Sequence, residues 1–346
     1  MAKESKSRNK KNKKIKQIFS EQLSLIKPTK QEFLFLKKNA EGLKSRIEKT
    51  AKKLKIKADC FIGGSLAKGT IIKKERHDLD IFARFEKKQK ENISESLEKI
   101  LKVSRIKFQR IHGSRDYFII QDGKGKEKKA KNKIFFEIVP VLKIRNPKQA
   151  ENTTDLSFFH VSYLARAIRK NPKLADEIML AKAFCHAQNC YGAESYIKGF
   201  SGYAIELLVC GYKGFLNFIK QIAHSTAKIV IDKEKLYKNR QDVLLNLNEA
   251  KLLSPVVLVD PTFKERNALA ALSAETFEKF KKSCAEFLRN PSKRFFEKQE
   301  IDINNLKKDA KTKKAQLIML SCSTDRQAGD VAGSKLLKFF CFCIFF

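Results

Sequence analysis

The segments FIGGSLAKGT (residues 61–70) and DLDIFARF (residues 78–85) carry most of the information about the fold of this chain. In the first, a short apolar strand ends in Gly63-Gly64-Ser65 and continues into the start of a helix. A helix N-terminus presents free backbone N–H groups and a partial positive charge to phosphate, and Ser65 and Lys68 add a hydroxyl and a cation. By itself such a glycine turn is more often structural than functional.

The second segment begins with two acids, Asp78 and Asp80, at the head of a strand predicted over residues 79–85. Because side chains alternate along a strand, the two carboxylates lie on the same face and repel each other. A divalent cation such as Mg²⁺, which prefers oxygen ligands, would remove that repulsion. Two ordinary acids on a solvent-facing edge strand are the alternative.

A third acid, Glu137, lies in a strand predicted over residues 134–139 and stopped by Pro140. An acid in so apolar a segment needs a partner or a purpose. Beside the first two carboxylates it would receive the proton of an attacking hydroxyl and help to hold a second ion. The alternative is an ion pair with one of the many Lys or Arg residues.

The order of these features resembles the polymerase-β superfamily of nucleotidyltransferases. Three further segments are similar to the archaeal-type CCA-adding enzymes. They are EIVP at residues 137–140, AFCHAQNCYGAESYIKGFSGY at residues 183–203 and VDPTFKERNA at residues 259–268. The resemblance extends from about residue 15 to residue 289.

This resemblance implies an α+β fold in which a polymerase-β-like nucleotidyltransferase head, a mixed sheet with helices, precedes a helical neck and an α+β body. The expected divisions are a disordered basic arm (1–17), the head (18–150), the neck or central domain (151–250), the body (251–304) and a diverged or truncated C-terminal segment (305–346). The periodicity predicts helices at 31–54, 92–102, 174–189, 203–223 and 273–288, strands at 56–62, 117–120 and 256–259, and an exposed loop at 122–133.

The resemblance also implies an activity: template-independent addition of C, C and A to the tRNA 3′ end from CTP and ATP, with release of pyrophosphate. Two Mg²⁺ ions would be held by Asp78, Asp80 and Glu137. The implied nucleotide-binding residues are Gly64, Ser65 and Lys68 for the triphosphate, then His160, Lys182, Tyr191 and Arg266, the last helping to choose C and A.

The sequence departs from that family at several positions. Glu137 replaces an Asp and Lys68 an Arg, and residues 155–160 lack the Arg-Thr-Pro that precedes the family's His. Residues 305–346 do not resemble the family's tail domain, so three alternatives stay open: the tail is missing, it is strongly diverged, or a second chain or a homodimer supplies its function. A poly(A) or other terminal RNA nucleotidyltransferase, and a catalytically inactive tRNA-binding protein, are the alternatives.

The composition favours an anionic partner. Lys and Arg number 73 against 38 Asp and Glu, a formal net charge of +35, which suits the acceptor stem and 3′ end of tRNA. The eight cysteines lie mostly in apolar stretches without a disulfide pattern, so reduced thiols and a cytoplasmic location are expected. No apolar run is long enough to span a membrane, and the run at residues 336–346 is expected to form a strand, a docking segment or an aggregation-prone end.

Overall fold

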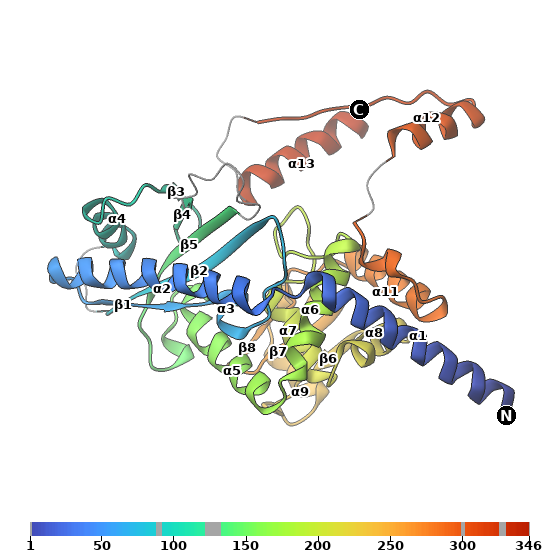
Figure 1. Cartoon of the computed structure of the whole chain (residues 1–346), viewed down its shortest axis with the longest axis horizontal. Helices are drawn as coiled ribbons and strands as arrows, with labels where there is room; N and C mark the ends of the chain where they lie inside the picture. The colour runs from blue at the N-terminus through green and yellow to red at the C-terminus, as the bar shows by residue number, and fades with distance from the viewer. Residues whose placement is uncertain (1, 88–91, 122–132, 299–301, 325–329, 346) are drawn as a thin grey trace.

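The computed structural model describes residues 2–87, 92–121, 133–298, 302–324 and 330–345. Within these residues an N-terminal sheet with its helices adjoins a helical region, and a second, smaller sheet follows (Figure 1). This is the mixed α+β architecture that the sequence predicts. The exposed loop expected at 122–133 lies outside the described residues except for Lys133, which begins a strand.

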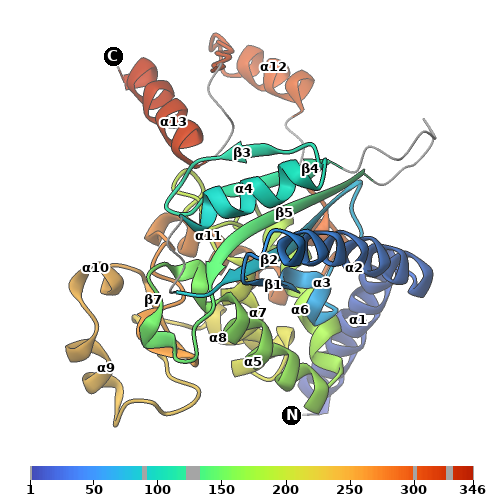
Figure 2. The ribbon, with the colours of Figure 1, turned by 90° about the vertical axis from the view of Figure 1, so that its left-hand side faces the viewer.

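The larger sheet has five strands in the order β1-β2-β5-β4-β3. They are β1 (Ala58–Ile62), β2 (Arg76–Phe85), β3 (Gln109–Ile111), β4 (Tyr117–Gln121) and β5 (Lys133–Leu142). β2 runs parallel to β5, whereas the other neighbouring pairs are antiparallel, so the sheet is mixed. Figure 2 shows β2 and β5 side by side along the length of the sheet.

Pro140 was predicted to stop its strand, and this prediction is wrong. β5 continues to Leu142, and Pro140 pairs with Ala83 of β2. On the opposite side of β5 the pairing with β4 ends at Ile138, so Pro140 has a neighbouring strand on one side only. A proline lacks the N–H donor, and it is tolerated where one side of the strand has no ladder to complete.

Helices α2 (Lys30–Lys53) and α4 (Ile93–Val103) share one apolar core with this sheet. α2 begins at a capping box in which Thr29 and Glu32 accept each other's backbone N–H groups, and it buries the stripe Leu36, Ala40, Ile47 and Ala51. The spacing of that stripe is the helical period read from the sequence, and the predictions at 31–54 and 92–102 are confirmed.

A second core is built by helices α5 (Ser157–Lys170), α6 (Lys173–Ala187), α7 (Gly202–Gly211), α8 (Phe215–Ala223) and α11 (Ala274–Arg289). Stacked and edge-on phenylalanines fill it, among them Phe184, Phe215 and Phe280. The helix predicted at 203–223 is two helices. The break falls at Lys213 and Gly214, both with positive φ (58° and 136°), a conformation that glycine adopts readily.

The described part of the N-terminal arm, residues 2–17, is helical, which corrects the prediction of a disordered arm there. Helix α1 (Ala2–Ile26) buries Ile15, Ile18 and Phe19 in the second core, and Phe19 stacks on Phe287 with ring centroids 6.0 Å apart. The prediction of disorder was based on the lysine-rich composition of the arm. The apolar stripe lies only at its C-terminal end, near residue 20.

The smaller sheet has the order β6-β7-β8, with β6 (Ile229–Ile231) parallel to β7 (Val256–Asp260) and β7 antiparallel to β8 (Phe263–Asn267). In the sequence, the short helices α9 (Arg240–Asn246) and α10 (Glu249–Leu252) connect β6 to β7. The sequence analysis placed the boundary between neck and body at residue 251. The smaller sheet crosses this boundary, because its strand β6 lies before residue 251.

Two helices follow near the C-terminus, α12 (Ile303–Thr312) and α13 (Asp330–Phe345). The apolar run at 336–346 had been expected to form a strand, a docking segment or an aggregation-prone end, and its described part is helical. The hydroxyl groups of Ser334 on α13 and Ser195, in the loop before α7, form a hydrogen bond. Among the described residues no helix is long and apolar enough to cross a bilayer.

Candidate active site

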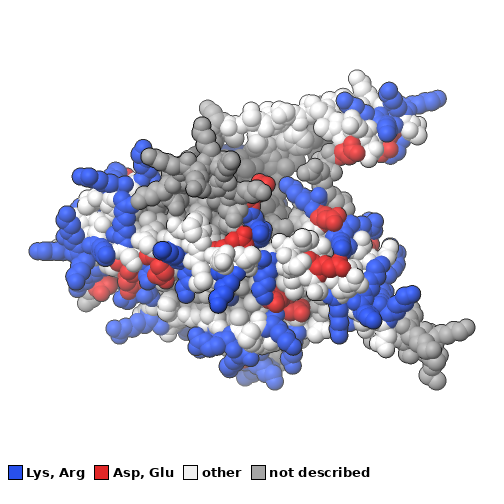
Figure 3. Space-filling model, in the orientation of Figure 1, with Lys and Arg blue, Asp and Glu red and all other residues white. Residues whose placement is uncertain are grey.

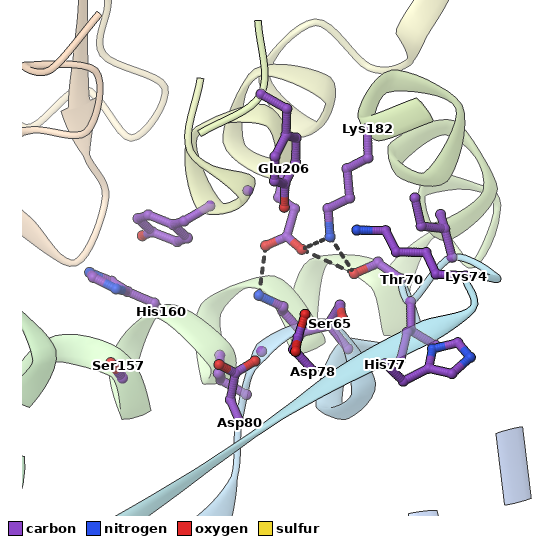
Figure 4. A pocket seen from close by; sticks show the side chains of 18 of the residues that line it. Ser65, Thr70, Lys74, His77, Asp78, Asp80, Ser157, His160, Lys182 and Glu206 are labelled. Atoms are coloured by element: carbon purple, nitrogen blue, oxygen red, sulfur yellow. Dashed lines mark hydrogen bonds and ion pairs between the residues drawn. The ribbon is translucent and has the colours of Figure 1, made fainter. Parts of the chain in front are cut away.

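A polar cavity of about 380 Å³ opens between the larger sheet and the helical region. Its wall combines α3 (Gly64–Lys68), the head of β2 and side chains from α5, α6 and α7 (Figure 4). Eight of the ten site residues predicted from the sequence line it: Gly64, Ser65, Lys68, Asp78, Asp80, His160, Lys182 and Tyr191. Segments more than a hundred residues apart in sequence thus meet at one cavity.

The glycine turn is fitted closely to the acids of β2. The Gly63 N–H donates to the backbone carbonyl of Asp80 (2.9 Å), which fixes the end of β1 beside β2. Gly64 has φ 56°, and a Cβ added there would lie 1.7 Å from Asp80 Oδ2. Only a residue without a side chain leaves room for this carboxylate, so the second glycine is required sterically as well as conformationally.

The three acids lie on adjacent strands. Asp80 of β2 and Glu137 of β5 are paired positions, and parallel pairing puts their side chains on the same face. Burial, together with the neighbouring carboxylates of Asp80 and Asp78, raises the pKa of Glu137 to about 7. Burial, opposed by Lys68 and reinforced by Asp78, raises the pKa of Asp80 to about 6. Like charges gathered in one buried place therefore oppose ionisation of Glu137 and of Asp80.

Asp78 is held by a cation of its own strand. Arg76 Nε donates to Asp78 Oδ1 at 2.9 Å, and the guanidinium lies 3.9 Å from the centroid of the Phe135 ring. Within the part of the chain that the structure describes, no three Asp, Glu, His or Cys side chains are close enough together to hold a metal ion as they stand. The donor set nevertheless fits a hard divalent cation, because three mutually repelling carboxylates supply oxygen ligands. To bind the ion, the Asp78 carboxylate would have to give up its ion pair with Arg76.

A buried ionic network crosses from the head to the helices. Glu206 of α7 forms an ion pair with Lys68, whose Nζ lies 2.7 Å from Oε2, and accepts a hydrogen bond on Oε1 from Lys182 Nζ, also at 2.7 Å. Thr70 Oγ1 accepts from Lys182 Nζ and donates to Glu206 Oε1, each at 3.0 Å. All four side chains line the cavity (Figure 4 labels three of them).

A second network surrounds Asp260, at the end of β7. His160 Nε2 lies 3.0 Å and Arg266 Nη1 2.8 Å from Asp260 Oδ2, and the Tyr203 hydroxyl donates to Oδ1 (3.0 Å). The His160 and Tyr203 rings stack with centroids 4.0 Å apart. Burial opposes ionisation, yet His160 and Arg266 hold the pKa of Asp260 well below its usual range. Arg266 does not line the cavity. It forms an ion pair with Asp260, the residue that also contacts His160.

Tyr191 stacks on His186 with ring centroids 3.8 Å apart, and Lys74 Nζ lies 3.4 Å from His186 Nε2. All three line the cavity. Burial, with the nearby charges of Lys74 and Lys182, lowers the pKa of His186 to about 4, so the ring is neutral near pH 7. Tyr191 therefore presents an aromatic wall next to a cation.

Glu137 and Arg266 are the two predicted residues outside the cavity wall. The sequence interpretation left out others that line it, notably Glu206, Thr70, Lys74 and His186. Glu206 carried a usable signal, because it is a lone acid in an otherwise apolar helix, the argument that had already selected Glu137.

The fold and the site together define the class. The structure superimposes on a cytoplasmic RNA terminal U-transferase with a TM-score of 0.62 at 12% sequence identity, covering 84% of this chain and 100% of that one. A Cid1 poly(U) polymerase bound to Mg and 3′-dATP matches equally, with a TM-score of 0.62 at 13% identity over 82% and 98% of the two chains. The chain has the polymerase-β-type nucleotidyltransferase fold.

The sequence narrows this class to one family. Residues 176–297 match the family described as tRNA nucleotidyltransferase, second domain. The chain is 40% identical to the CCA-adding enzyme of Nanoarchaeum equitans over 258 residues, 73% of this chain and 62% of that enzyme. It is 29% identical to the CCA-adding enzyme of Thermococcus gammatolerans over 82% of this chain and 61% of that enzyme. The chain is a relative of the archaeal-type CCA-adding enzymes, as its motifs had predicted, and it spans about three fifths of their length.

Proposed function

We propose that the chain is a nucleotidyltransferase that adds C, C and A to the 3′ end of tRNA, taking CTP and ATP and releasing pyrophosphate. The observation that carries this proposal is the meeting of the glycine turn, the carboxylates of Asp78 and Asp80 and two lysines at one cavity. The similarity to CCA-adding enzymes over 73% of the chain supports the choice of tRNA and of these two nucleotides.

In this proposal the tRNA 3′-hydroxyl attacks the α-phosphate in line, and pyrophosphate leaves. Asp78, Asp80 and Glu137 would hold two Mg²⁺ ions, which when bound would lower the pKa of the hydroxyl and neutralise phosphate charge. Glu137, whose pKa is already raised to about 7, is suited to accept the proton of the attacking hydroxyl.

The triphosphate would lie against the glycine turn. Ser65 would donate its hydroxyl, and Lys68 and Lys182 would supply two cations from opposite sides of the cavity. Tyr191 would pack against the sugar or base, while His160 and Arg266, both held by Asp260, would read the base edge. Hydrogen-bond donors and acceptors held in place by a buried partner discriminate bases better than mobile ones.

Lys and Arg side chains are spread widely over the face seen in Figure 3, with smaller patches of Asp and Glu among them. With a net charge of +35, the chain would bind the phosphates of an acceptor stem without reading internal sequence. A second chain or a second copy supplying the remaining tRNA contacts is part of the proposal. The proposal also includes a cytoplasmic location. This location agrees with the eight free cysteines, five of which are buried.

The test is incorporation of labelled CTP and ATP, with Mg²⁺, into tRNA transcripts that end before CCA, after C and after CC. Addition of two C and one A followed by a stop supports the proposal. Extension with ATP alone would assign the chain to a poly(A)-type activity instead. Tight tRNA binding without any incorporation, unchanged after addition of a candidate tail polypeptide, would assign it to the inactive tRNA-binding proteins.

A further inference from the structure

We infer that Glu206 is a positioning residue for the nucleoside triphosphate, holding the ammonium groups of Lys68 and Lys182 side by side on one carboxylate at the cavity wall. This inference rests on the proposed function, since it needs a triphosphate in the cavity. It adds to that proposal a residue that contacts no substrate itself and acts through the two lysines.

The geometry is that of a single anion shared by two cations. Each oxygen of Glu206 lies 2.7 Å from a different Nζ, and the side chains of Lys68, Lys182 and Glu206 are 7%, 6% and 1% exposed. Lys68 belongs to the head and the other two to the helical region, so the carboxylate also fixes the distance between the two walls of the cavity. Figure 4 shows the Glu206 carboxylate next to the ammonium group of Lys182.

Stability alone does not account for this arrangement. A buried ion pair has a desolvation penalty that often cancels its attraction, and a well-packed apolar replacement is frequently as stable. Lys68, Lys182 and Glu206 together carry a buried net charge of +1. Packing of the core does not require this charge. An excess of positive charge facing a cavity suits a polyanion such as a triphosphate.

The shared carboxylate also favours the charged form of Lys182. Burial opposes ionisation of Glu206, but the two lysines lower its pKa to about 2, so it is an anion at neutral pH. Burial lowers the pKa of Lys182; Glu206 opposes this shift, and Lys68 and Lys74 add to it. Asp80 on β2 and His186 on α6 also interact electrostatically with Lys182. Without Glu206, two neighbouring buried ammonium groups would repel, and one would lose its proton at a lower pH.

Donors remain for the ligand. An ammonium has three N–H donors, and among the described contacts Lys68 uses one, to Glu206, and Lys182 uses two, to Glu206 and Thr70. Each lysine thus keeps a donor for a phosphate oxygen while Glu206 holds the amine in place. The expected consequence of losing Glu206 is weaker nucleotide binding at high pH, with little change in the chemical step.

The experiment compares CTP binding, by calorimetry with Mg²⁺ present, and KM and kcat for CTP addition in the full chain, at several pH values between about 6.5 and 9. In Glu206→Gln the affinity is expected to fall by up to about tenfold per pH unit over the upper part of this range, with the rise in KM exceeding the fall in kcat. The wild type is expected to change by less than about threefold. Glu206→Asp, which keeps the charge but has a shorter reach, is expected to bind more weakly while recovering the wild-type pH profile.

Asp176→Asn is the matched control. Asp176 lies on α6 with Lys182, but its ion pair with Lys27 is exposed, so this variant should follow the wild-type profile. If Glu206→Gln fails to fold in thermal unfolding, Thr70→Val replaces it, removing only the hydroxyl that bridges Lys182 and Glu206, and a smaller shift in the same direction is expected. A folded variant with unchanged KM and pH profile overturns the inference alone. A wild type that binds no CTP rejects the proposed function and the inference with it.

Discussion

Asp80 on β2 and Glu137 on β5 are paired residues of two parallel strands, and both carboxylates have raised pKa values. They are 57 positions apart in the sequence, yet the register of one strand pair makes them neighbours on one face. Asp80 and Asp78 oppose ionisation of Glu137, and Asp78 opposes ionisation of Asp80. The site thus stores repulsion that a divalent cation would relieve, and this relationship leads to the first prediction.

Mg²⁺ is expected to stabilise the protein more at about pH 8 than at about pH 6. The ordinary pKa values of these acids are 3.8 and 4.5, and the folded values are about 6 and about 7. A raised folded pKa means that stability falls as pH rises from about 4 to about 7, because the folded state holds protons that the unfolded chain has released. Above that window the ion meets no competing proton. Thermal unfolding with and without Mg²⁺ at both pH values tests this, and an equal increment at both would contradict it.

Asp80→Asn is expected to reduce nucleotide incorporation more than about 100-fold, the loss that even outer partners of metal ligands reach. Affinity for tRNA should remain within about twofold, because the surface lysines that bind phosphate are unchanged. Asp59→Asn is a suitable control, since Asp59 lies on the neighbouring strand and pairs with Arg84 and Lys143 instead. Retained incorporation in the Asp80 variant would exclude it as a metal ligand.

Two glycines with the same backbone conformation separate steric from conformational effects. Gly64→Ala places a Cβ 1.7 Å from Asp80 Oδ2, whereas Gly69→Ala meets nothing within 4 Å, and both have positive φ (56° and 65°). Each should lose about 1–2 kcal/mol of unfolding free energy through backbone strain. Only the Gly64 variant should also lose nucleotide incorporation, because it displaces Asp80. Similar activities in the two variants would show that the close approach does not matter.

Arg266→Ala is expected to lower the preference for CTP and ATP over UTP and GTP by at least about fivefold, since a missing hydrogen bond to a base edge costs about 1 kcal/mol or more. Arg240→Ala, which removes an exposed arginine bonded to a backbone carbonyl, serves as the control. Misincorporation is measured with each nucleotide separately on a transcript lacking CCA.

Asp260→Ala is expected to destabilise the fold by about 3–5 kcal/mol, because His160 and Arg266 lose their common partner.

The exposed lysines of α1 are expected to contribute to RNA affinity through charge alone. Replacing Lys10, Lys11, Lys13 and Lys14 with Gln preserves helix propensity, so α1 should stay folded. The slope of log K against log salt for tRNA binding should become shallower by about 0.7–0.9 for each phosphate that the helix no longer neutralises. Filter binding at several salt concentrations measures the slope, and an unchanged value would show that this helix does not touch the RNA.

Much of the head could be predicted because its signals are local. The helical stripe of α2, the alternation along β2 and the glycine turn before α3 each depend on residues within a few positions of one another. The same locality explains the failures. Pro140 is tolerated because of where β4 ends, and α1 folds because Phe19 reaches a core built by residues beyond 160. Neither fact is present in the local pattern.

The sequence by itself determined which residue types could meet a phosphate and a cation: a glycine turn, an Asp-x-Asp strand and a lone acid, in an order that resembles the polymerase-β superfamily. The tertiary structure alone decided the partners of these groups. Glu206 acquires its two lysines, and Asp260 its histidine and arginine, only when head, helices and smaller sheet pack together. The physical reason is that alternation and helical period fix the face on which a side chain lies. The buried partner that keeps a side chain charged and oriented is set by packing between segments far apart in the chain.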